Sequence, residues 1–298
     1  MSTSSSRRFL LTGSTGRLGS HVLRELVGRG LSVTAWGGQA DSELFGTRIH
    51  PVDVSIPDVT VAAFREANPD TVIHTAAVSS VEDCERDPSR SRLINCDSTG
   101  LLAELAAETR SRFVLTSTDL VFDGEQGWYR ESDDPNPLST YGRTKATAEQ
   151  FTLAVPGGVV ARLSLLFGPT LTGRHSFFDH LLSAVRGGRP ITLFTDEWRT
   201  PFAFPNAAAG LVEIALSDYC GLMHMGGPER LSRAEMGDRL ARFLGCDPGS
   251  IVPTTRAEAG LVAVRPRDTS LDSSLWREQF TGYQAEGWEE SLAAMSVA

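Results

Sequence analysis

The stretch Thr12-Gly13-Ser14-Thr15-Gly16-Arg17-Leu18-Gly19 stands between a short apolar run and a helical pattern. Glycines at a strand-to-helix junction permit a sharp turn, close approach of the backbone to a pyrophosphate and tight packing of the helix on the strand. The first turn of such a helix also attracts anions, because its N–H groups and dipole point outward. The segment therefore predicts a loop that binds a dinucleotide. We expect the cofactor to contact Gly13, Thr15, Gly16, Arg17, Leu18 and Gly19.

Apolar runs and helical patterns alternate on both sides of this loop. The expected strands are Arg8 to Thr12, Leu31 to Trp36, Thr71 to Thr75, Phe113 to Ser117 and Val159 to Arg162. The expected helices are Leu18 to Val27, Val59 to Ala67, Ser91 to Glu108 and Tyr141 to Ala154. Such alternation predicts an α/β fold of the Rossmann type, in which helices cover both faces of a doubly wound parallel sheet.

Beyond Leu163 the chain changes character, and loops rich in Gly and Pro separate shorter elements. Helices are expected at Phe177 to Arg186, Ala207 to Leu216 and Arg233 to Leu244. Ser232 and Glu235 have the spacing of a capping box before the last of these helices. We therefore expect a disordered tail at residues 1–7, an NAD(P)-binding domain at 8–162, and a smaller lobe at 163–298. That lobe should mainly bind substrate, and parts of it can cross back to the Rossmann sheet.

Composition narrows the range of functions. The chain has 298 residues, 41% of them hydrophobic and 22% charged, as in ordinary globular proteins. A formal net charge of -9 argues against a nucleic-acid partner. No apolar run approaches the roughly 20 residues of a membrane helix, and the start of the chain lacks the apolar core of a signal peptide. We expect a cytoplasmic protein whose four dispersed cysteines are reduced.

Tyr141 and Lys145 form a Y-x-x-x-K pair, and a spacing of four places both side chains on one face of a helix. Reduction of a ketone by hydride produces an alkoxide that needs a proton. A free tyrosine, with a pKa near ~10, is a poor donor at neutral pH. A nearby ammonium stabilises the phenolate and lowers that pKa. The pair therefore predicts a catalytic acid, Tyr141, assisted by Lys145.

The G-x-x-G-x-x-G spacing and the Y-x-x-x-K pair together resemble the short-chain dehydrogenase/reductase superfamily. The resemblance implies that Asp53 contacts adenine and that the small residues after His74-Thr75 lie close to the cofactor. It gives Lys145 a second contact, to the nicotinamide ribose, and it gives Thr118 the carbonyl oxygen of the substrate. The further cofactor contacts that it implies are Val54, Ala76, Ala77, Tyr141 and Leu163.

Three segments resemble one branch of this superfamily, the dTDP-4-dehydrorhamnose reductases. They are Ser117-Thr118-Asp119-Leu120-Val121-Phe122-Asp123-Gly124, Asp196-Glu197-Trp198-Arg199-Thr200-Pro201 and Arg265-Pro266-Arg267-Asp268-Thr269-Ser270-Leu271-Asp272. The resemblance covers roughly Arg8 to Asp272 and implies reduction of the 4-keto group of a nucleotide-linked deoxysugar. It makes Thr118, Asp119, Arg199 and Arg265 candidate substrate contacts.

Of these, Arg199 is the first candidate for the substrate pyrophosphate, because a planar guanidinium suits paired phosphate oxygens. The alternative is a surface salt bridge of Arg199 with Glu197 or Asp196. Arg265 is the second candidate. Its alternative is a structural tie between the C-terminal region and the core.

Departures from the family pattern leave parts of the function open. Leu165-Leu166-Phe167 replaces the usual Trp-Val-Tyr, so the sugar is not identified. Pro205-Asn206 replaces the usual Asp-Leu, and we expect no metal. Leu120 stands where sugar dehydratases have a Glu, which argues against a dehydratase. The remaining alternatives are an epimerase and a non-catalytic binding protein like the β subunit of methionine adenosyltransferase.

The choice between NAD and NADP depends on the residues after the second expected strand. An acid there would bind the ribose 2′-OH and repel a 2′-phosphate. No acid lies between Trp36 and Ala40, and Arg17 is a candidate partner for the phosphate. We therefore expect NADP(H) to be preferred over NAD(H). The expected partner is a nucleotide sugar, and a homodimer is one oligomeric state that the sequence leaves open.

Overall fold

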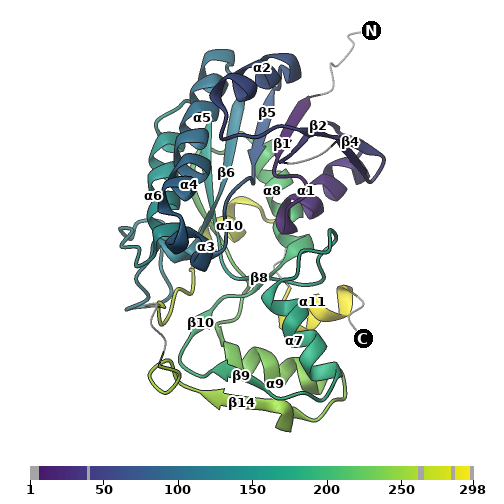
Figure 1. Ribbon diagram of the computed structural model, residues 1–298, viewed down its shortest axis with the longest axis vertical. Coiled ribbons are helices and arrows are strands. Elements are labelled where there is room, and N and C mark those ends of the chain that lie inside the picture. The colour runs from purple at the N-terminus through teal and green to yellow at the C-terminus, as the bar shows by residue number, and fades with distance from the viewer. Residues whose placement is uncertain (1–6, 39–40, 261–264, 283–285, 296–298) are drawn as a thin grey trace. The chain divides into compact units, whose positions relative to one another are not determined.

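The computed structural model describes residues 7–38, 41–260, 265–282 and 286–295. Its main element is an eight-stranded sheet with the strand order β12-β7-β6-β5-β1-β2-β4-β3 (Figure 1). The strands are β1 (Arg8–Thr12), β2 (Ser32–Gly37), β3 (Ser42–Leu44), β4 (Thr47–Pro51), β5 (Thr71–His74), β6 (Arg112–Thr118), β7 (Gly158–Leu163) and β12 (Gly221–Met225). β1 pairs in parallel with β2 and β5, as do β2 with β4 and β5 with β6, whereas β3 runs antiparallel to β4.

The central strands are buried along nearly their whole length, which explains their continuous apolar sequences. Every residue of β5 and of β7 is buried. The five strands expected from the sequence are present, β1 with the predicted ends and the others with ends that differ by at most one residue. The short antiparallel β3 was not predicted, because it lies at the edge of the sheet and its residues are mostly polar and exposed.

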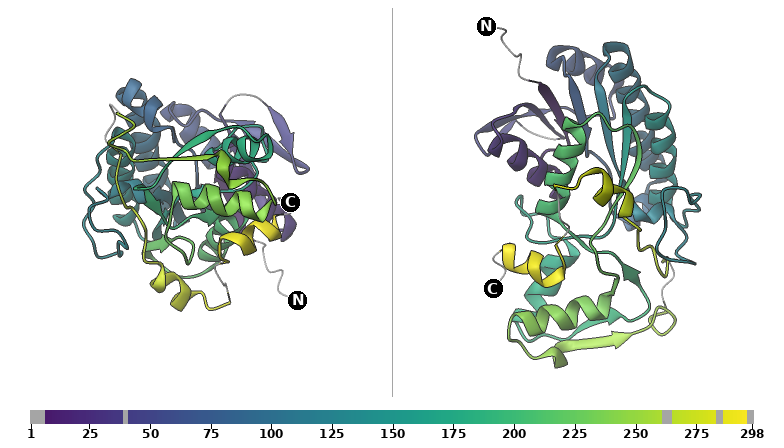
Figure 2. Two further views of the ribbon diagram at one scale, coloured as in Figure 1. Left: turned by 90° about the horizontal axis from the view of Figure 1, so that it is seen from below. Right: turned by 180° about the vertical axis from the view of Figure 1, so that it is seen from behind.

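Helices cover both faces of this sheet. The helical segments of this part are α1 (Arg17–Gly28), α2 (Pro57–Ala67), α3 (Val81–Arg86), α4 (Pro88–Arg92), the π-helical η1 (Leu93–Asp97), α5 (Ser98–Thr109), α6 (Thr140–Leu153) and α8 (Phe204–Leu216). Figure 1 shows α2, α5 and α6 on one face, and Figure 2 shows α1 and α8 on the other. The Arg29–Glu213 ion pair, 2.6 Å, joins the end of α1 to α8. The predicted doubly wound α/β fold is confirmed.

One helix differs from its prediction. The expected helix from Ser91 to Glu108 is helical throughout, but its π-helical turn η1 separates α4 from α5. A π-helical turn shifts the side chains that follow it around the helix axis, and such turns occur often at functional sites. Periodicity of apolar residues carries no signal for a turn of this kind.

Contacts divide the chain into two compact units. The first consists of Met1–Ser117, Thr140–Ala161 and Ala207–Met223, and the second of Thr118–Ser139, Arg162–Asn206 and His224–Ala298. The core of the first unit packs side chains of α2, α5 and α6 against the sheet, including Phe64, Leu102, Phe113, Ala148 and Val160. The expected assignment of 8–162 to cofactor and 163–298 to substrate stays a prediction.

The second unit has a separate apolar core. Phe167, Phe178, Leu240 and Trp288 belong to it, and the Phe167 and Trp288 rings lie 4.2 Å apart. Its elements are η2 (Asp119–Val121), β8 (Leu166–Phe167), α7 (Phe177–Arg186), β9 (Ile191–Phe194), β10 (Trp198–Arg199), β11 (Phe202–Ala203), β13 (Leu231–Ser232), α9 (Arg233–Phe243), η3 (Pro248–Ser250), β14 (Ile251–Thr254), α10 (Ser274–Gln279) and α11 (Trp288–Ala294).

The capping box predicted at the start of α9 is confirmed. Ser232 Oγ accepts a hydrogen bond from Glu235 N at 3.1 Å, and Ser232 N donates to Glu235 Oε2 at 2.7 Å. These two bonds satisfy N–H groups that the helix itself cannot pair. Within the described ranges, no helix combines the length and the apolar character needed to span a membrane.

Candidate active site

The glycine loop between β1 and α1 is built so that two of its glycines have no room for a side chain. Gly13 has a φ of +69°, and a Cβ there would lie 2.7 Å from Ala76 N. A Cβ on Gly19 would lie 2.1 Å from Gly13 O. Gly16, the N-cap of α1, provides no side-chain cap, and the first helical turn contains no acidic residue. This cradle fits a pyrophosphate, because the backbone can approach closely and the helix N-terminus favours an anion.

Buried polar contacts hold the strand ends on both sides of this loop. Ser14 N and Oγ both donate to Trp36 O, at 3.0 and 2.9 Å. His74 lies between two threonines, with Nδ1 2.7 Å from Thr12 Oγ1 and Nε2 3.0 Å from Thr99 Oγ1. Burial lowers the pKa of His74 to about 3, so the imidazole is neutral at physiological pH. His74 thus joins β1, β5 and α5, a role that the sequence did not reveal.

The other predicted cofactor residues lie in the glycine loop or at and after the ends of the parallel strands. Arg17 Nη2 donates to Ser79 Oγ at 3.0 Å. Asp53 is exposed and accepts from both Ser55 N (3.0 Å) and Ser55 Oγ (2.6 Å), which lowers its pKa. The remaining predicted contacts lie in the glycine loop (Thr15, Leu18), after β4 (Val54), after β5 (Ala76, Ala77) and at the end of β7 (Leu163). Their contacts to a cofactor stay predictions.

Helix α6 carries both members of the Y-x-x-x-K pair. Glu85, from α3, accepts bonds from Thr140 N (2.6 Å) and Thr140 Oγ1 (2.8 Å) and so caps the first turn of α6. The side chain of Lys145 is 2% exposed. Burial lowers the pKa of the Lys145 ammonium to about 8, although the Glu149 carboxylate opposes this shift.

Two further polar residues connect α6 to its surroundings. Glu149, also 2% exposed, accepts a hydrogen bond from Ser117 Oγ near the end of β6. Asn95, in η1, donates to Thr144 Oγ1 at 3.1 Å and to Val78 O at 3.0 Å. Both residues were missed from the sequence. The available signal was weak: an acid one turn beyond Lys145 and an Asn within the short run Leu93-Ile94-Asn95-Cys96.

Thr118 ends β6 and belongs to the second unit, where its hydroxyl group has two contacts. Thr118 Oγ1 lies 3.2 Å from Asp119 Oδ1 and accepts a bond from Leu120 N at 3.2 Å. Asp119 is itself buried, and its Oδ2 accepts from Thr269 Oγ1 at 2.8 Å. Burial raises the pKa of Asp119, opposed by the Arg199 charge at 3.4 Å.

Arg199 is buried rather than exposed at the surface. It is 3% exposed and donates to Trp198 O (2.6 Å), Glu197 Oε1 (3.3 Å) and Pro266 O (3.4 Å), in addition to its ion pair with Asp119. The alternative, a surface salt bridge, was therefore right about the pairing of Arg199 with Glu197 but wrong about its position, because the pair is buried. A phosphate could reach Arg199 only if the side chain left these partners.

Arg265 differs from Arg199 in its exposure. Its side chain is 41% exposed, and its Nη1 lies 3.9 Å from Glu197 Oε2. The guanidinium also lies 6.0 Å from the ring centroid of Phe194. Arg265 and Glu197 thus form a long ion pair, which leaves the Arg265 guanidinium accessible to solvent.

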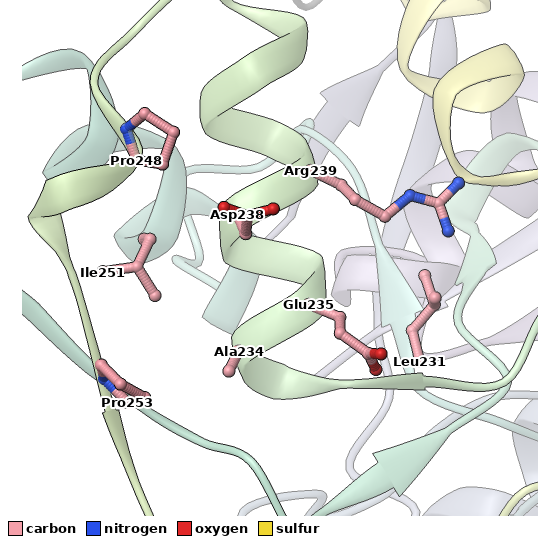
Figure 3. Close-up of a pocket in the computed structure, with 8 residues that line it drawn as sticks. All are labelled: Leu231, Ala234, Glu235, Asp238, Arg239, Pro248, Ile251 and Pro253. Atoms are coloured by element: carbon pink, nitrogen blue, oxygen red, sulfur yellow. The ribbon is translucent and has the colours of Figure 1, made fainter.

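The second unit also contains a cavity of about 400 Å³ next to α9, η3 and β14 (Figure 3). Its lining residues are Leu231, Ala234, Glu235, Asp238, Arg239, Pro248, Ile251 and Pro253. The charged groups at its wall already have partners, since Glu235 belongs to the capping box and Arg239 pairs with Glu229 and Glu289. None of the predicted site residues lines it. In the described part of the chain, no group of three or more His, Cys, Asp and Glu side chains could hold a metal.

Comparisons with known proteins agree with these features. The model of the RmlD substrate binding domain family matches residues 7–297. A probable low-salt glycan biosynthesis reductase of Haloferax volcanii is 30% identical over 292 residues, 97% of each chain. A probable dTDP-4,6-dihydroxy-2-methyloxan-3-one 4-ketoreductase of Streptomyces antibioticus is 31% identical over 91% of this chain and 88% of its own.

Structural similarity extends over the whole chain. The crystal structure of a dTDP-4-dehydrorhamnose reductase from Bacillus anthracis, in complex with NADP, has a TM-score of 0.87 and covers 98% of this chain and 99% of its own. At 21% identity, that likeness shows the fold. The family match covers nearly the full sequence and confirms the predicted resemblance. This chain belongs to the RmlD substrate binding domain family.

Proposed function

We propose that this protein is an NAD(P)H-dependent reductase of the 4-keto group of a nucleotide-linked deoxysugar. One observation carries the proposal: a glycine cradle suited to a dinucleotide and a Y-x-x-x-K pair occur together in a member of this family. The reductase is preferred to an epimerase or a regulatory protein because the Haloferax volcanii and Streptomyces antibioticus relatives are both named as reductases.

The residues of this chain have separate parts in the proposed reaction. The reduced nicotinamide supplies a hydride. Tyr141 donates its phenolic proton to the oxygen of the former carbonyl. Thr118 Oγ1, whose proton is donated to Asp119 Oδ1 in this structure, turns that proton toward the same oxygen. The Lys145 ammonium stabilises the phenolate that remains. With a pKa of about 8, Lys145 is mostly charged at neutral pH, as this role requires.

For the cofactor, we propose that NADP(H) is preferred, with the pyrophosphate at Gly13, Gly16 and Gly19 and the adenine near Asp53. The absence of an acid directly after β2 supports this preference. Arg17 is the proposed partner of the 2′-phosphate.

For the substrate, we propose Arg265 in place of Arg199 as the main contact of the pyrophosphate. Its side chain is 41% exposed, whereas Arg199 is buried among protein partners. Asp119 lies beside Thr118 and so would act close to the carbonyl.

The expected cytoplasmic location and the homodimer stay predictions. Analytical ultracentrifugation can test the homodimer.

The experiment that tests this function measures NADPH oxidation by the purified protein with dTDP- and UDP-linked 4-keto-6-deoxy sugars. We expect substrate-dependent oxidation with at least one of them and a product reduced at C4, which mass spectrometry and NMR would identify. Redistribution of stereochemistry without net oxidation of cofactor would indicate an epimerase. Binding of NADPH with no conversion of any of these sugars would contradict the proposal.

A further inference from the structure

The hydroxyl of Thr118 is held from two sides by neighbouring groups. Leu120 N donates to Thr118 Oγ1, and Thr118 Oγ1 donates to Asp119 Oδ1, each at 3.2 Å. Thr118 and Asp119 are both less than 10% exposed. The position of Oγ1 therefore depends on where the Asp119 carboxylate is held.

The Asp119 carboxylate is in turn held by two distant parts of the chain. Thr269 Oγ1 donates to Asp119 Oδ2 at 2.8 Å across 150 positions of sequence, and Arg199 Nε lies 3.4 Å from the same oxygen. The backbone fixes Thr269 as well, because Thr269 N donates to Trp198 O at 3.3 Å. The side chains of Thr269 and Arg199 are both buried, so solvent does not compete for these contacts.

We infer that Thr269 and Arg199 are positioning residues, which hold Asp119 so that Thr118 Oγ1 stays where it can meet the carbonyl oxygen of the substrate. The inference rests on the proposed function. In this role neither residue touches the substrate. Each acts through Asp119, and a small displacement of the reacting geometry costs much of the rate.

The contacts of Arg199 support this role over direct binding of phosphate. Its Nε faces Asp119, its Nη1 donates to Trp198 O, and its Nη2 donates to Glu197 and Pro266 O. A guanidinium whose three nitrogens all have protein partners is fixed as part of the scaffold. The Glu197 carboxylate, 1% exposed, also binds Arg233 at 3.2 Å, which anchors the network further.

Thr269→Val is the sharpest test, because valine keeps the shape of the side chain and removes only the hydroxyl. We expect kcat with the keto-sugar substrate to fall roughly tenfold or more, while KM and the affinities for NADPH and dTDP stay within about twofold. Thr269→Ser restores the hydroxyl and should recover most of kcat. Thr60→Val is the matched control, since Thr60 is equally buried but its hydroxyl donates to Ile56 O, at the N-cap of its own helix α2.

Arg199→Lys separates positioning from phosphate binding. We expect a reduced kcat with unchanged dTDP affinity by calorimetry, because lysine keeps the charge but cannot reproduce the forked contacts. Weaker dTDP binding with normal kcat would overturn the inference and assign Arg199 to the pyrophosphate. Thermal unfolding of each variant shows whether it is folded at the assay temperature.

Different results would contradict the positioning role of Thr269 and the reductase activity itself. An active wild type whose Thr269→Val variant is fully active, or whose Thr269→Ser variant is as slow as Thr269→Val, would overturn the inference alone. A wild type that reduces no keto sugar would overturn both, because no reaction would remain for Thr118 to assist.

Discussion

Glu149 provides a test of the electrostatics around Lys145 that leaves the packing intact. Both side chains are 2% exposed and lie one helical turn apart on α6. Glu149→Gln removes the negative charge but retains an oxygen that can accept the Ser117 hydroxyl bond. The variant therefore isolates the effect of the charge on Lys145.

The size of this effect follows from the spacing of the two residues. Residues at i and i+4 place their side chains about 6 Å apart, and opposite charges at that distance attract by about 3 kcal/mol at an effective dielectric constant of about 20. This energy corresponds to about 2 pKa units. The pKa of Lys145, about 8 in the native protein, should therefore fall well below that value in the variant.

The assay is the pH dependence of kcat/KM for the keto-sugar reaction. Activity requires the ammonium form, so the rate declines as the pH rises through the pKa of Lys145, and a lower pKa moves this decline to lower pH. At pH 7 the ammonium form of Lys145, which predominates in the wild type, would become the minor form in the variant, and the rate would fall by roughly tenfold. Near pH 5 the two proteins should be alike.

The control for this experiment is Glu104→Gln, which removes an exposed acid from the neighbouring helix α5. In this control, the decline of kcat/KM at high pH (the alkaline limb of the profile) should occur at the same pH as in the wild type. If the alkaline limb of Glu149→Gln also stayed at the wild-type pH, Lys145 would not be held in its charged form by Glu149. The proposed electrostatic coupling between the two side chains would then be refuted.

Three further predictions concern the ligands. NADPH should bind more tightly than NADH by calorimetry, and Arg17→Ala should reduce this preference. Equal affinities of the wild type for NADPH and NADH would exclude a preference for NADP(H). Gly19→Ala should weaken NADPH binding at least tenfold, because the added methyl would meet Gly13 O at 2.1 Å, and it should destabilise the fold by about 1–3 kcal/mol. Gly28→Ala, in the same helix but with open space around it, should do neither. Arg265→Ala should weaken dTDP binding by about 2 kcal/mol and leave NADPH binding unchanged, and normal dTDP affinity would remove Arg265 from the site.

Local sequence patterns were sufficient to predict the central strands and the residues proposed for catalysis. The buried strands β1, β5 and β7 are continuous apolar runs, and such runs are distinctive because both faces of the strand are covered. The glycine loop and the Y-x-x-x-K pair are also local, since each is determined by spacing within one turn or one helix. Polar, exposed edge strands such as β3 lack this signal.

Contacts between distant segments could not be predicted in the same way. The Thr269–Asp119 bond spans 150 positions, and neither residue carries a pattern that points to the other. The capping of α6 by Glu85 and the burial of Arg199 depend equally on tertiary packing. For Arg199, charge and a loop-like sequence suggested exposure, but four protein acceptors compensate for its burial.

The most direct test of the proposed reaction compares wild type with Tyr141→Phe in NADPH oxidation driven by a dTDP-linked 4-keto-6-deoxy sugar. The substitution removes one hydroxyl and hardly changes the packing. We predict that wild type catalyses the reaction. The variant should bind NADPH normally, but its turnover should be slower by at least about 10²-fold, the scale of a lost general acid. Turnover by Tyr141→Phe at close to the wild-type rate would contradict the assignment of Tyr141 as the proton donor.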